Sequence, residues 1–274
     1  LAPSQIKLAI LYQLQEDLDQ SSQLFQVTVQ QLRDLGEKWP EDASLQKSLA
    51  IALGNTANLH YEMAKIGESE RLAVESLALF RTLQRENPRD SSLAVNMGNA
   101  LNLAGLIKYE RGEIDEAAKD FQQGVEQFDR LLETESQNPD YLQSRAALLI
   151  SLASTMRSLG NISAEETAYK QALESYELLV VVVPDIPAFK EALAITLVDL
   201  GQLQFQVDDL ESATASFSRA TTIYKELLAR SPLPSITEGL ATSTQMLGRC
   251  YLSRAELAPA RTHVSNSVYL FNEL

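Results

Sequence analysis

The chain has 274 residues, of which 45% are hydrophobic and 22% are charged, and its formal net charge is −14. This composition excludes an intrinsically disordered protein, and the acidic balance argues against binding to nucleic acid or to anionic membrane surfaces, which requires patches of Lys and Arg. The most apolar run, residues 178–183, ends at Pro184 and is far shorter than a membrane-spanning helix, so no direct membrane insertion is expected.

From its first unit onward, the sequence repeats itself with a period of 48 residues. Large apolar or aromatic residues recur at Leu32, Phe80, Phe128, Tyr176 and Tyr224. Small residues recur at Ala9, Ala57, Gly105, Ala153, Gly201 and Gly248. A fixed period of this size is typical of solenoids and propellers, and the three- and four-residue spacing of apolar residues inside each unit is helical. The sequence therefore predicts a helical solenoid.

Prolines mark the predicted unit boundaries, because proline cannot continue a helix and disfavours helical angles in the residue before it. Pro40, Pro88, Pro139, Pro184 and Pro232 divide the chain into units 1–40, 41–88, 89–139, 140–184, 185–232 and 233–274. Each unit is predicted to hold two antiparallel helices. The residues placed to cap the first helix of a unit are Asp42, Asp90 or Ser91, Asp140, Asp185 and Ser235.

Several local features are predicted within these units. The uneven proline spacing around the third unit predicts a longer loop at residues 133–138 and a first helix shortened by about one turn. Trp39 is expected to pack as a lid over the next helix. Ser163 and Glu166 predict a capping box at the start of a second helix. Residues 178–183 have high strand propensity, but we interpret them as a helix end because tertiary context overrides propensity.

The columns of small and of aromatic residues, that is, the positions where such residues recur from one repeat to the next, resemble the tetratricopeptide (TPR) pattern. The residues that carry the resemblance are Leu197, Leu200, Gly201, Leu210, Ala213, Phe217 and Ala220, and again Leu101, Gly105, Gly112, Ala117 and Phe121. The ordinary TPR unit has about 34 residues, so each helix here is extended. The long unit is similar to TPR arrays of large bacterial signalling proteins, notably those attached to serine/threonine kinases.

The resemblance implies an all-α, right-handed α-α superhelix of about six antiparallel helix pairs, forming one solenoid over residues 1–274. A small residue in the first helix lets the second helix approach, and the aromatic residue of the second helix fills the remaining space. HEAT or armadillo solenoids are the alternative, but those repeats lack paired small columns around an aromatic residue such as Phe217.

No constellation of catalytic or metal-binding residues is visible in the sequence. His60 and His263 have no second ligand at metal-binding spacing, and no metalloprotease, hydrolase or kinase motif is present. Cys250 cannot form an internal disulfide and is expected in the core. We therefore expect no cofactor, no metal and no enzymatic activity in this chain.

The concave groove, lined in this repeat type by the first helices, is the remaining candidate site. The residues predicted to face it are Asn58, Tyr61, Glu62, Asn99, Asn102, Tyr109, Glu110, Arg157, Phe205 and Arg249. Asparagine offers both a donor and an acceptor to the main chain of an extended peptide, tyrosines recur at interfaces, and the glutamates favour a basic ligand. In the alternative interpretation the asparagines, with Asn55 and Asn96, hydrogen-bond between neighbouring first helices and hold the superhelical pitch.

The leading interpretation is a non-enzymatic scaffold that binds a protein or peptide, basic in character, in this groove. The alternative is a regulatory or dimerising arm of a larger signalling enzyme, such as a bacterial serine/threonine kinase.

Both ends of the chain are apolar, with Leu8, Leu11 and Leu14 near the start and residues 267–274 at the end. Exposed apolar surface of this kind suggests self-association. The chain begins at Leu1 without a signal-peptide pattern, so we take it as part of a longer, cytoplasmic protein.

Overall fold

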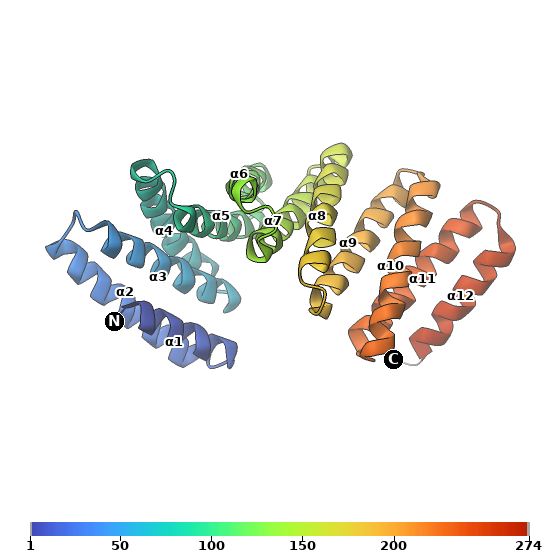
Figure 1. Cartoon of the computed structure of the whole chain (residues 1–274), viewed down its shortest axis with the longest axis horizontal. Helices are drawn as coiled ribbons and strands as arrows, with labels where there is room; N and C mark the ends of the chain where they lie inside the picture. The colour runs from blue at the N-terminus through green and yellow to red at the C-terminus, as the bar shows by residue number, and fades with distance from the viewer. Residues whose placement is uncertain (1, 273–274) are drawn as a thin grey trace. The chain divides into compact units, whose positions relative to one another are not determined.

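The structure is a computed structural model that describes residues 2–272, and these residues form twelve α-helices and no strand (Figure 1). The helices are α1 (Ala2–Leu14), α2 (Leu18–Lys38), α3 (Ala43–Glu62), α4 (Ile66–Glu86), α5 (Ser91–Glu110), α6 (Ile114–Thr134), α7 (Pro139–Ser158), α8 (Ile162–Val182), α9 (Pro187–Gln206), α10 (Leu210–Arg230), α11 (Pro234–Ser253) and α12 (Leu257–Asn272). The prediction of an all-α fold is confirmed. The last two residues of the apolar closing segment lie outside the described residues.

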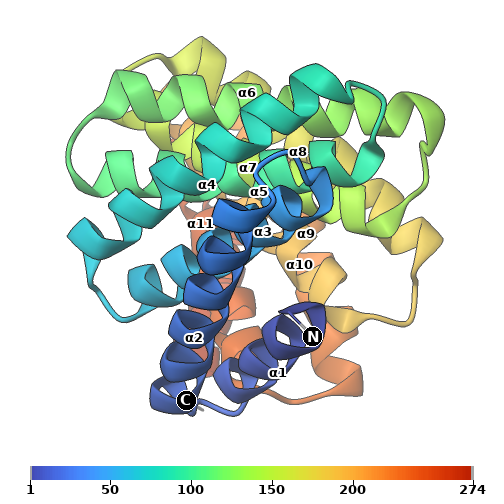
Figure 2. The ribbon, with the colours of Figure 1, turned by 90° about the vertical axis from the view of Figure 1, so that its left-hand side faces the viewer.

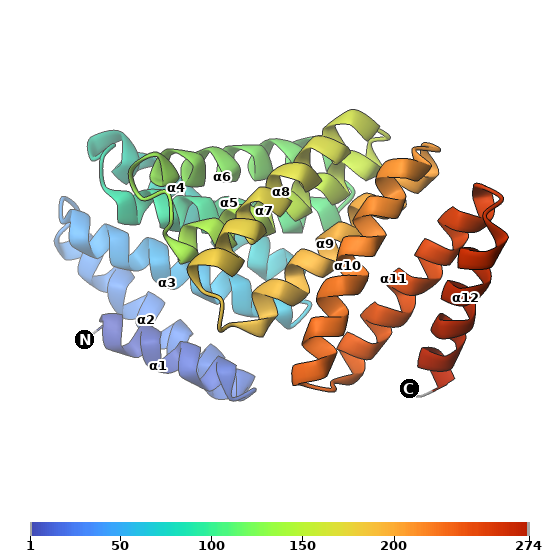
Figure 3. The same ribbon diagram turned by 45° about the vertical axis from the view of Figure 1, so that its right-hand side comes forward.

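The chain divides into an N-terminal half, Leu1–Thr134 with α1–α6, and a C-terminal half, Glu135–Leu274 with α7–α12. Within each half, successive helices pack as antiparallel pairs, and each second helix also packs on the first helix of the next pair. Figure 2 shows α1 beside α2 in the N-terminal half, and Figure 3 shows α9 to α12 side by side in chain order. Each half is therefore a TPR-like stack. The single solenoid over residues 1–274 stays a prediction.

The repeat is more regular than the prolines suggested. The helices α3, α5, α7 and α9 each have 20 residues, and they begin 48 residues apart at Ala43, Ser91, Pro139 and Pro187. The prediction of a shortened first helix in the third unit is therefore wrong. Pro139 does not end a second helix, because α6 already ends at Thr134 and Pro139 is the first residue of α7.

Proline at the first helical position explains this difference and three misplaced caps. Its missing N–H is one that the helix leaves unpaired anyway, and its fixed φ suits the helix. The predicted caps Asp42 and Asp90 are confirmed, and each accepts hydrogen bonds from backbone N–H groups of the first turn. Asp140, Asp185 and Ser235 are not caps; the cap positions belong to Asn138, Ile186 and Leu233, each directly before a proline.

Smaller predictions had mixed outcomes. Helix α8 begins after Asn161, whose side chain accepts the N–H of Ala164, so the capping box of Ser163 and Glu166 is wrong. Trp39 directly follows the last residue of α2 and has 55% of its surface exposed, so it is not a buried lid. The run at residues 178–183 is helical up to Val182, as predicted. Cys250 is fully buried, as expected for a core residue.

The predicted packing of small residues against aromatic rings is confirmed at two positions. A Cβ atom added to Gly105 of α5 would lie 2.6 Å from the ring of Phe121 on α6, and one added to Gly201 of α9 would lie 2.9 Å from the ring of Phe217 on α10. Both rings are at most 1% exposed. Glycine thus allows the two helices of a pair to close around the aromatic side chain.

None of the helices described between residues 2 and 272 combines the length and apolar character needed to cross a membrane.

Candidate functional site

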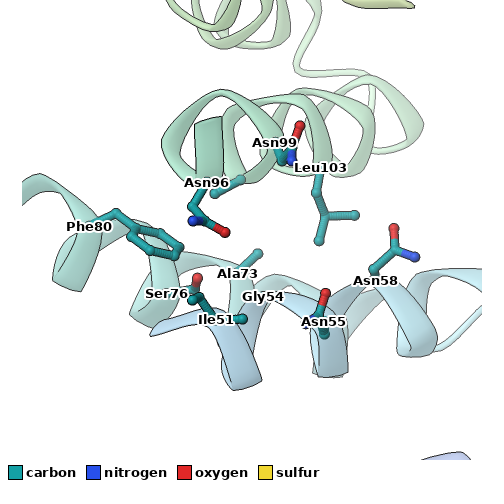
Figure 4. A pocket seen from close by; sticks show the side chains of 11 residues that line it. Ile51, Gly54, Asn55, Asn58, Ala73, Ser76, Phe80, Asn96, Asn99 and Leu103 are labelled. Carbon is teal, nitrogen blue, oxygen red and sulfur yellow. The ribbon is translucent and has the colours of Figure 1, made fainter. Parts of the chain in front are cut away.

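A pocket of about 170 Å³ lies between α3 and α5 in the N-terminal half. Its lining consists of Ile51, Gly54, Asn55 and Asn58 from α3, Ala73, Ser76 and Phe80 from α4, and Asn96, Asn99, Ala100 and Leu103 from α5. Figure 4 shows asparagines on both facing helices, with the ring of Phe80 at one end. The pocket therefore combines four amide side chains with an apolar surface, and we call it the asparagine pocket.

Gly54 provides part of the space in this pocket, because it has no side chain. A Cβ atom there would lie 3.1 Å from the Oγ of Ser76, which donates a 2.7 Å hydrogen bond to the carbonyl of Ala50 and so fixes α4 close to α3. Because position 54 carries no side chain, the surface of α3 is open beside Asn55. The close helix contact and the missing side chain together leave room for a ligand.

The asparagines do not hydrogen-bond between neighbouring first helices. Asn58 donates to the Oε1 of Glu62 at 2.8 Å, and Asn96 donates to the carbonyl of Ser92 at 2.6 Å, so both bonds stay within one helix. Within residues 2–272, the side-chain amides of Asn55 and Asn99 form no hydrogen bond. The interpretation that these amides hold the helical pitch is therefore wrong. Two amides are left with donors and acceptors that a ligand can use.

Asn102 is a predicted groove residue that does not line the pocket. Its side chain is half-buried on α5, and its Oδ1 is enclosed without a hydrogen-bond partner in the described part of the chain. Tyr109 is half-buried at the end of the same helix. Neither residue is among those that line the asparagine pocket.

Tyr61 and the two predicted glutamates lie near the ends of α3 and α5. Tyr61 packs against the core and is half-buried; burial, and secondarily the charge of Glu110, raises the pKa of its phenol. Glu62 is exposed, but its carboxylate accepts hydrogen bonds from the side chains of Gln13 at 2.6 Å and Asn58 at 2.8 Å. Tyr61 and Glu62 therefore have structural contacts in addition to any role in binding, whereas Glu110 is exposed at the end of α5.

Arg157 is held by its own helix pair. Its Nε donates to the Oε1 of the buried Glu165 at 2.7 Å, and its Nη2 donates to the hydroxyl of Tyr169 at 2.7 Å. Burial is the largest single influence on the pKa of the guanidinium, and it lowers the pKa. The hydrogen bond to Glu165 and the neighbouring acidic groups together outweigh burial, so the pKa is raised. The side chain is therefore a tie between α7 and α8.

Phe205 and Arg249 come together in the C-terminal half. The guanidinium carbon of Arg249 on α11 lies 5.0 Å from the ring centre of Phe205 on α9, within the range of a cation–π contact. Gln202, Gln206 and Met246 complete the lining of a pocket around them. The structure thus brings together Asn58 with Asn99 in one half and Phe205 with Arg249 in the other.

Sequence reasoning missed Ser76 and Phe80 as pocket residues, because both stand in columns that otherwise pack the core. Phe80 is 2% exposed, yet its ring reaches the pocket. The available signal was Gly54, which stands where the next repeats carry Asn102, Ile150 and Val198. A missing side chain at one position of a repeat is a local cue for empty space.

The two histidines have separate surroundings. His60 is buried, and its Nδ1 lies 2.9 Å from the Oε2 of Glu68; burial lowers its pKa. The ring of His263 stacks on Tyr251 with centroids 5.4 Å apart. Among residues 2–272 there is no group of three His, Cys, Asp or Glu side chains placed to hold a metal ion.

No family model and no curated protein sequence matches this chain. Solved structures do match. The crystal structure of BtubC (BKLC) from P. vanneervenii aligns with a TM-score of 0.66 at 18% identity, covering 93% of this chain and 91% of that one. The S. pombe nuclear import adaptor Nro1 aligns with a TM-score of 0.72 at 14% identity, covering 98% and 94%.

A third structure makes the fold explicit. The putative kinesin light chain from Podosopora anserina, described as having nearly identical TPR-like repeats, aligns with a TM-score of 0.54 at 17% identity over 81% of this chain and 94% of that one. At these identities the likeness is one of fold. The chain therefore has a TPR-like helical-repeat fold.

Proposed function

We propose that this protein is a non-catalytic scaffold that binds an extended segment of a partner protein in the asparagine pocket. The observation that carries the proposal is the pair Asn55 and Asn99, whose amides face a pocket from two helices without hydrogen-bond partners among the described residues. Each amide offers two donors and an acceptor, which match the N–H and C=O groups of an extended main chain. The neighbour Nro1 is described as a nuclear import adaptor, which is a protein-binding role of that protein.

The dimensions of the pocket limit what can enter it. An apolar cavity of about 150 Å³ is large enough for benzene, so a pocket of about 170 Å³ accepts one side chain of that size. Ile51, Phe80 and Leu103 supply the apolar contact for it. The ligand segment would therefore place one apolar side chain in the pocket, while asparagine amides hold the main chain on either side.

Removing the two unpartnered amides tests this proposal. In the Asn55→Ala/Asn99→Ala variant we expect partner binding to weaken roughly tenfold or more, because each lost hydrogen bond costs about 1 kcal/mol. The thermal midpoint should change little, since neither amide has a hydrogen-bond partner among residues 2–272. The measurement is a quantitative pull-down from the source lysate beside a thermal melt.

Gln122→Ala/Gln123→Ala is the matched control, because it removes two exposed amides from α6 of the same half. A partner lost with the asparagine variant and retained with the control supports the pocket. A partner retained by both variants contradicts it. Tyr61 is a poorer probe than the asparagines, because it packs on the core and its removal would also lower stability.

Glu62 and Glu110 are the last residues of α3 and α5, the two helices that form the pocket, so we propose a basic segment as the ligand. The second interpretation, an arm of a larger signalling enzyme such as a bacterial serine/threonine kinase, stays a prediction. A cytoplasmic location also stays a prediction.

Self-association through the apolar ends is a further prediction. Leu11 and Leu14 on α1 are 53% and 75% exposed, and Val268 and Tyr269 on α12 are 54% and 63% exposed. Exposed apolar side chains in one patch commonly mark contacts. We expect the sedimentation mass to rise with protein concentration and Leu11→Gln/Leu14→Gln to reduce the rise; a monomer at every concentration contradicts this prediction.

A further inference from the structure

A second cleft lies between α9 and α11 in the C-terminal half, with a volume of about 250 Å³. Three of its lining residues, Ile195, Asp199 and Tyr224, stand three repeats after Ile51, Asn55 and Phe80 of the asparagine pocket. The repeat therefore forms the same cleft twice, once in each half. The side chains differ in chemistry, because a carboxylate replaces an amide and a phenol replaces a phenyl ring.

Tyr224 gives this cleft a buried polar group. Its side chain is only 3% exposed, it lines the cleft, and its hydroxyl has no hydrogen-bond partner among residues 2–272. The phenol lies directly against Gly239 of α11, where an added Cβ atom would be 2.7 Å from the hydroxyl oxygen. Because Tyr224 lines the cleft and its hydroxyl has no partner among the described residues, a ligand in the cleft can gain affinity by hydrogen-bonding to it.

The cleft is also anionic. The cleft is lined by Glu191, Asp199 and Glu238, and none of these three carboxylates forms a hydrogen bond or ion pair within the described chain. Lys190, next to Glu191 in the sequence, does not pair with these carboxylates, because its Nζ forms an ion pair with the Oε2 of Glu226 at 3.3 Å.

The charges around Asp199 and Tyr224 agree with this picture. Burial, the largest cause, raises the pKa of Asp199; Arg157 opposes the rise and Glu165 adds to it. Arg157 is itself held by Glu165 and Tyr169. Burial, with Glu191 and Asp199, raises the pKa of Tyr224 to about 12. A cation in the cleft would stabilise these carboxylates in their charged form.

We propose that the cleft between α9 and α11 binds the side chain of a lysine presented by a segment of a partner protein. An ammonium group has three donors on one compact charge, which suits carboxylates on two helices together with the Tyr224 hydroxyl. The aliphatic stem of lysine can lie along the apolar surface of Ile195 and Val198. The inference extends the proposed scaffold function to the second half, with a different recognition chemistry.

The test uses the full chain with selectively labelled isoleucine methyl groups, observed by NMR. The probe is the peptide acetyl-Gly-Ser-Ala-Lys-Ala-Ser-Gly-amide, with two matched peptides that carry norleucine or arginine in place of lysine. We expect the lysine peptide to shift the methyl signal of Ile195, which lines the cleft. The Asp199→Asn/Glu238→Gln variant should bind it roughly tenfold more weakly, since charge-assisted hydrogen bonds are about twice as strong as neutral ones.

Two further variants make the result specific. Tyr224→Phe keeps the ring and removes only the hydroxyl, so it should weaken binding without closing the cleft. Glu174→Gln/Asp185→Asn removes two exposed carboxylates elsewhere in the same half and should leave binding unchanged. Each of the two charge variants removes two negative charges. If they weaken binding unequally, the change in net charge does not explain the effect, because the attraction of exposed charges is screened by salt.

The inference is overturned if the Ile195 signal does not move with the lysine peptide, if norleucine or arginine binds as well as lysine, or if the Glu174→Gln/Asp185→Asn control weakens binding equally. Such a failure is distinguishable from failure of the asparagine pocket. The pull-down with Asn55→Ala/Asn99→Ala probes α3 and α5 alone and does not depend on this cleft.

Discussion

Replacing Lys108 by Met is expected to lower the free energy of unfolding by about 3 kcal/mol, because it leaves a buried carboxylate without its cation. The Nζ of Lys108 on α5 lies 2.6 Å from the Oδ2 of Asp120 on α6, and the Asp120 side chain is only 6% exposed. An aspartate at this depth cannot be solvated by water once the ammonium is gone. The midpoint of urea unfolding, followed by circular dichroism, measures the loss.

The repeat itself supplies the compensating variant. Met156 and Ala168 stand one repeat after Lys108 and Asp120, so one helix pair already carries an apolar combination at these two positions. The double variant Lys108→Met/Asp120→Ala should therefore recover most of the stability lost by Lys108→Met alone, since no charge is left buried. A double variant as unstable as the single one would show that the pair is not the cause.

Lys170→Met is the control for the loss of a lysine. Its Nζ lies 2.8 Å from Glu166, but both side chains are well exposed, at 58% and 37%. Exposed ion pairs contribute about 0–1 kcal/mol. We therefore expect a far smaller effect on the urea midpoint than for Lys108→Met.

Phe121→Ala is expected to destabilise the N-terminal half by about 3–5 kcal/mol. The Phe121 ring is 1% exposed and lies against Gly105, which has no side chain to fill the space that the ring would leave. The resulting cavity would lie between α5 and α6, so their packing loses both transfer free energy and van der Waals contact.

The graded variant Phe121→Leu separates volume from aromatic character. Leucine keeps much of the buried volume, so we expect a loss well below that of Phe121→Ala. Val74→Ala on α4, a residue 63% exposed in the same half, should have little effect. Equal unfolding midpoints for Phe121→Ala and the native chain would contradict the packing described for Gly105 and Phe121.

Much of the fold could be predicted from the sequence, because the columns of small and aromatic residues are a direct record of helix packing. Gly105 with Phe121, and Gly201 with Phe217, were predicted as neighbours and are neighbours. Pro139 was misplaced for a physical reason: proline is excluded from helix interiors but favoured at the first helical position, so its presence alone does not say on which side of it the helix lies.

The candidate site was less accessible to the sequence. The sequence predicts that asparagines of the first helices are candidate site residues, but it does not give their hydrogen bonds, which depend on which amide reaches which neighbour. Only the structure places Asn58 beside Glu62 and leaves the amide of Asn55 without a partner among the described residues. Arg157 stands in the same column as Tyr61 and Phe205, yet it is tied to Glu165 on its partner helix. A repeat column gives the face of a helix and does not give the partner of a side chain.

By itself, the sequence determined that this protein is an all-α array of helix pairs with a 48-residue period. That result follows from short-range packing, which every repeat encodes in the same positions. Tertiary structure alone decided that the chain forms two halves. It also decided that the amides in one cleft of the repeat are left without partners, and that carboxylates gather with the hydroxyl of Tyr224 in the corresponding cleft of the other half. The reason is that a cleft is the space left between helices, which depends on all the side chains around it at once.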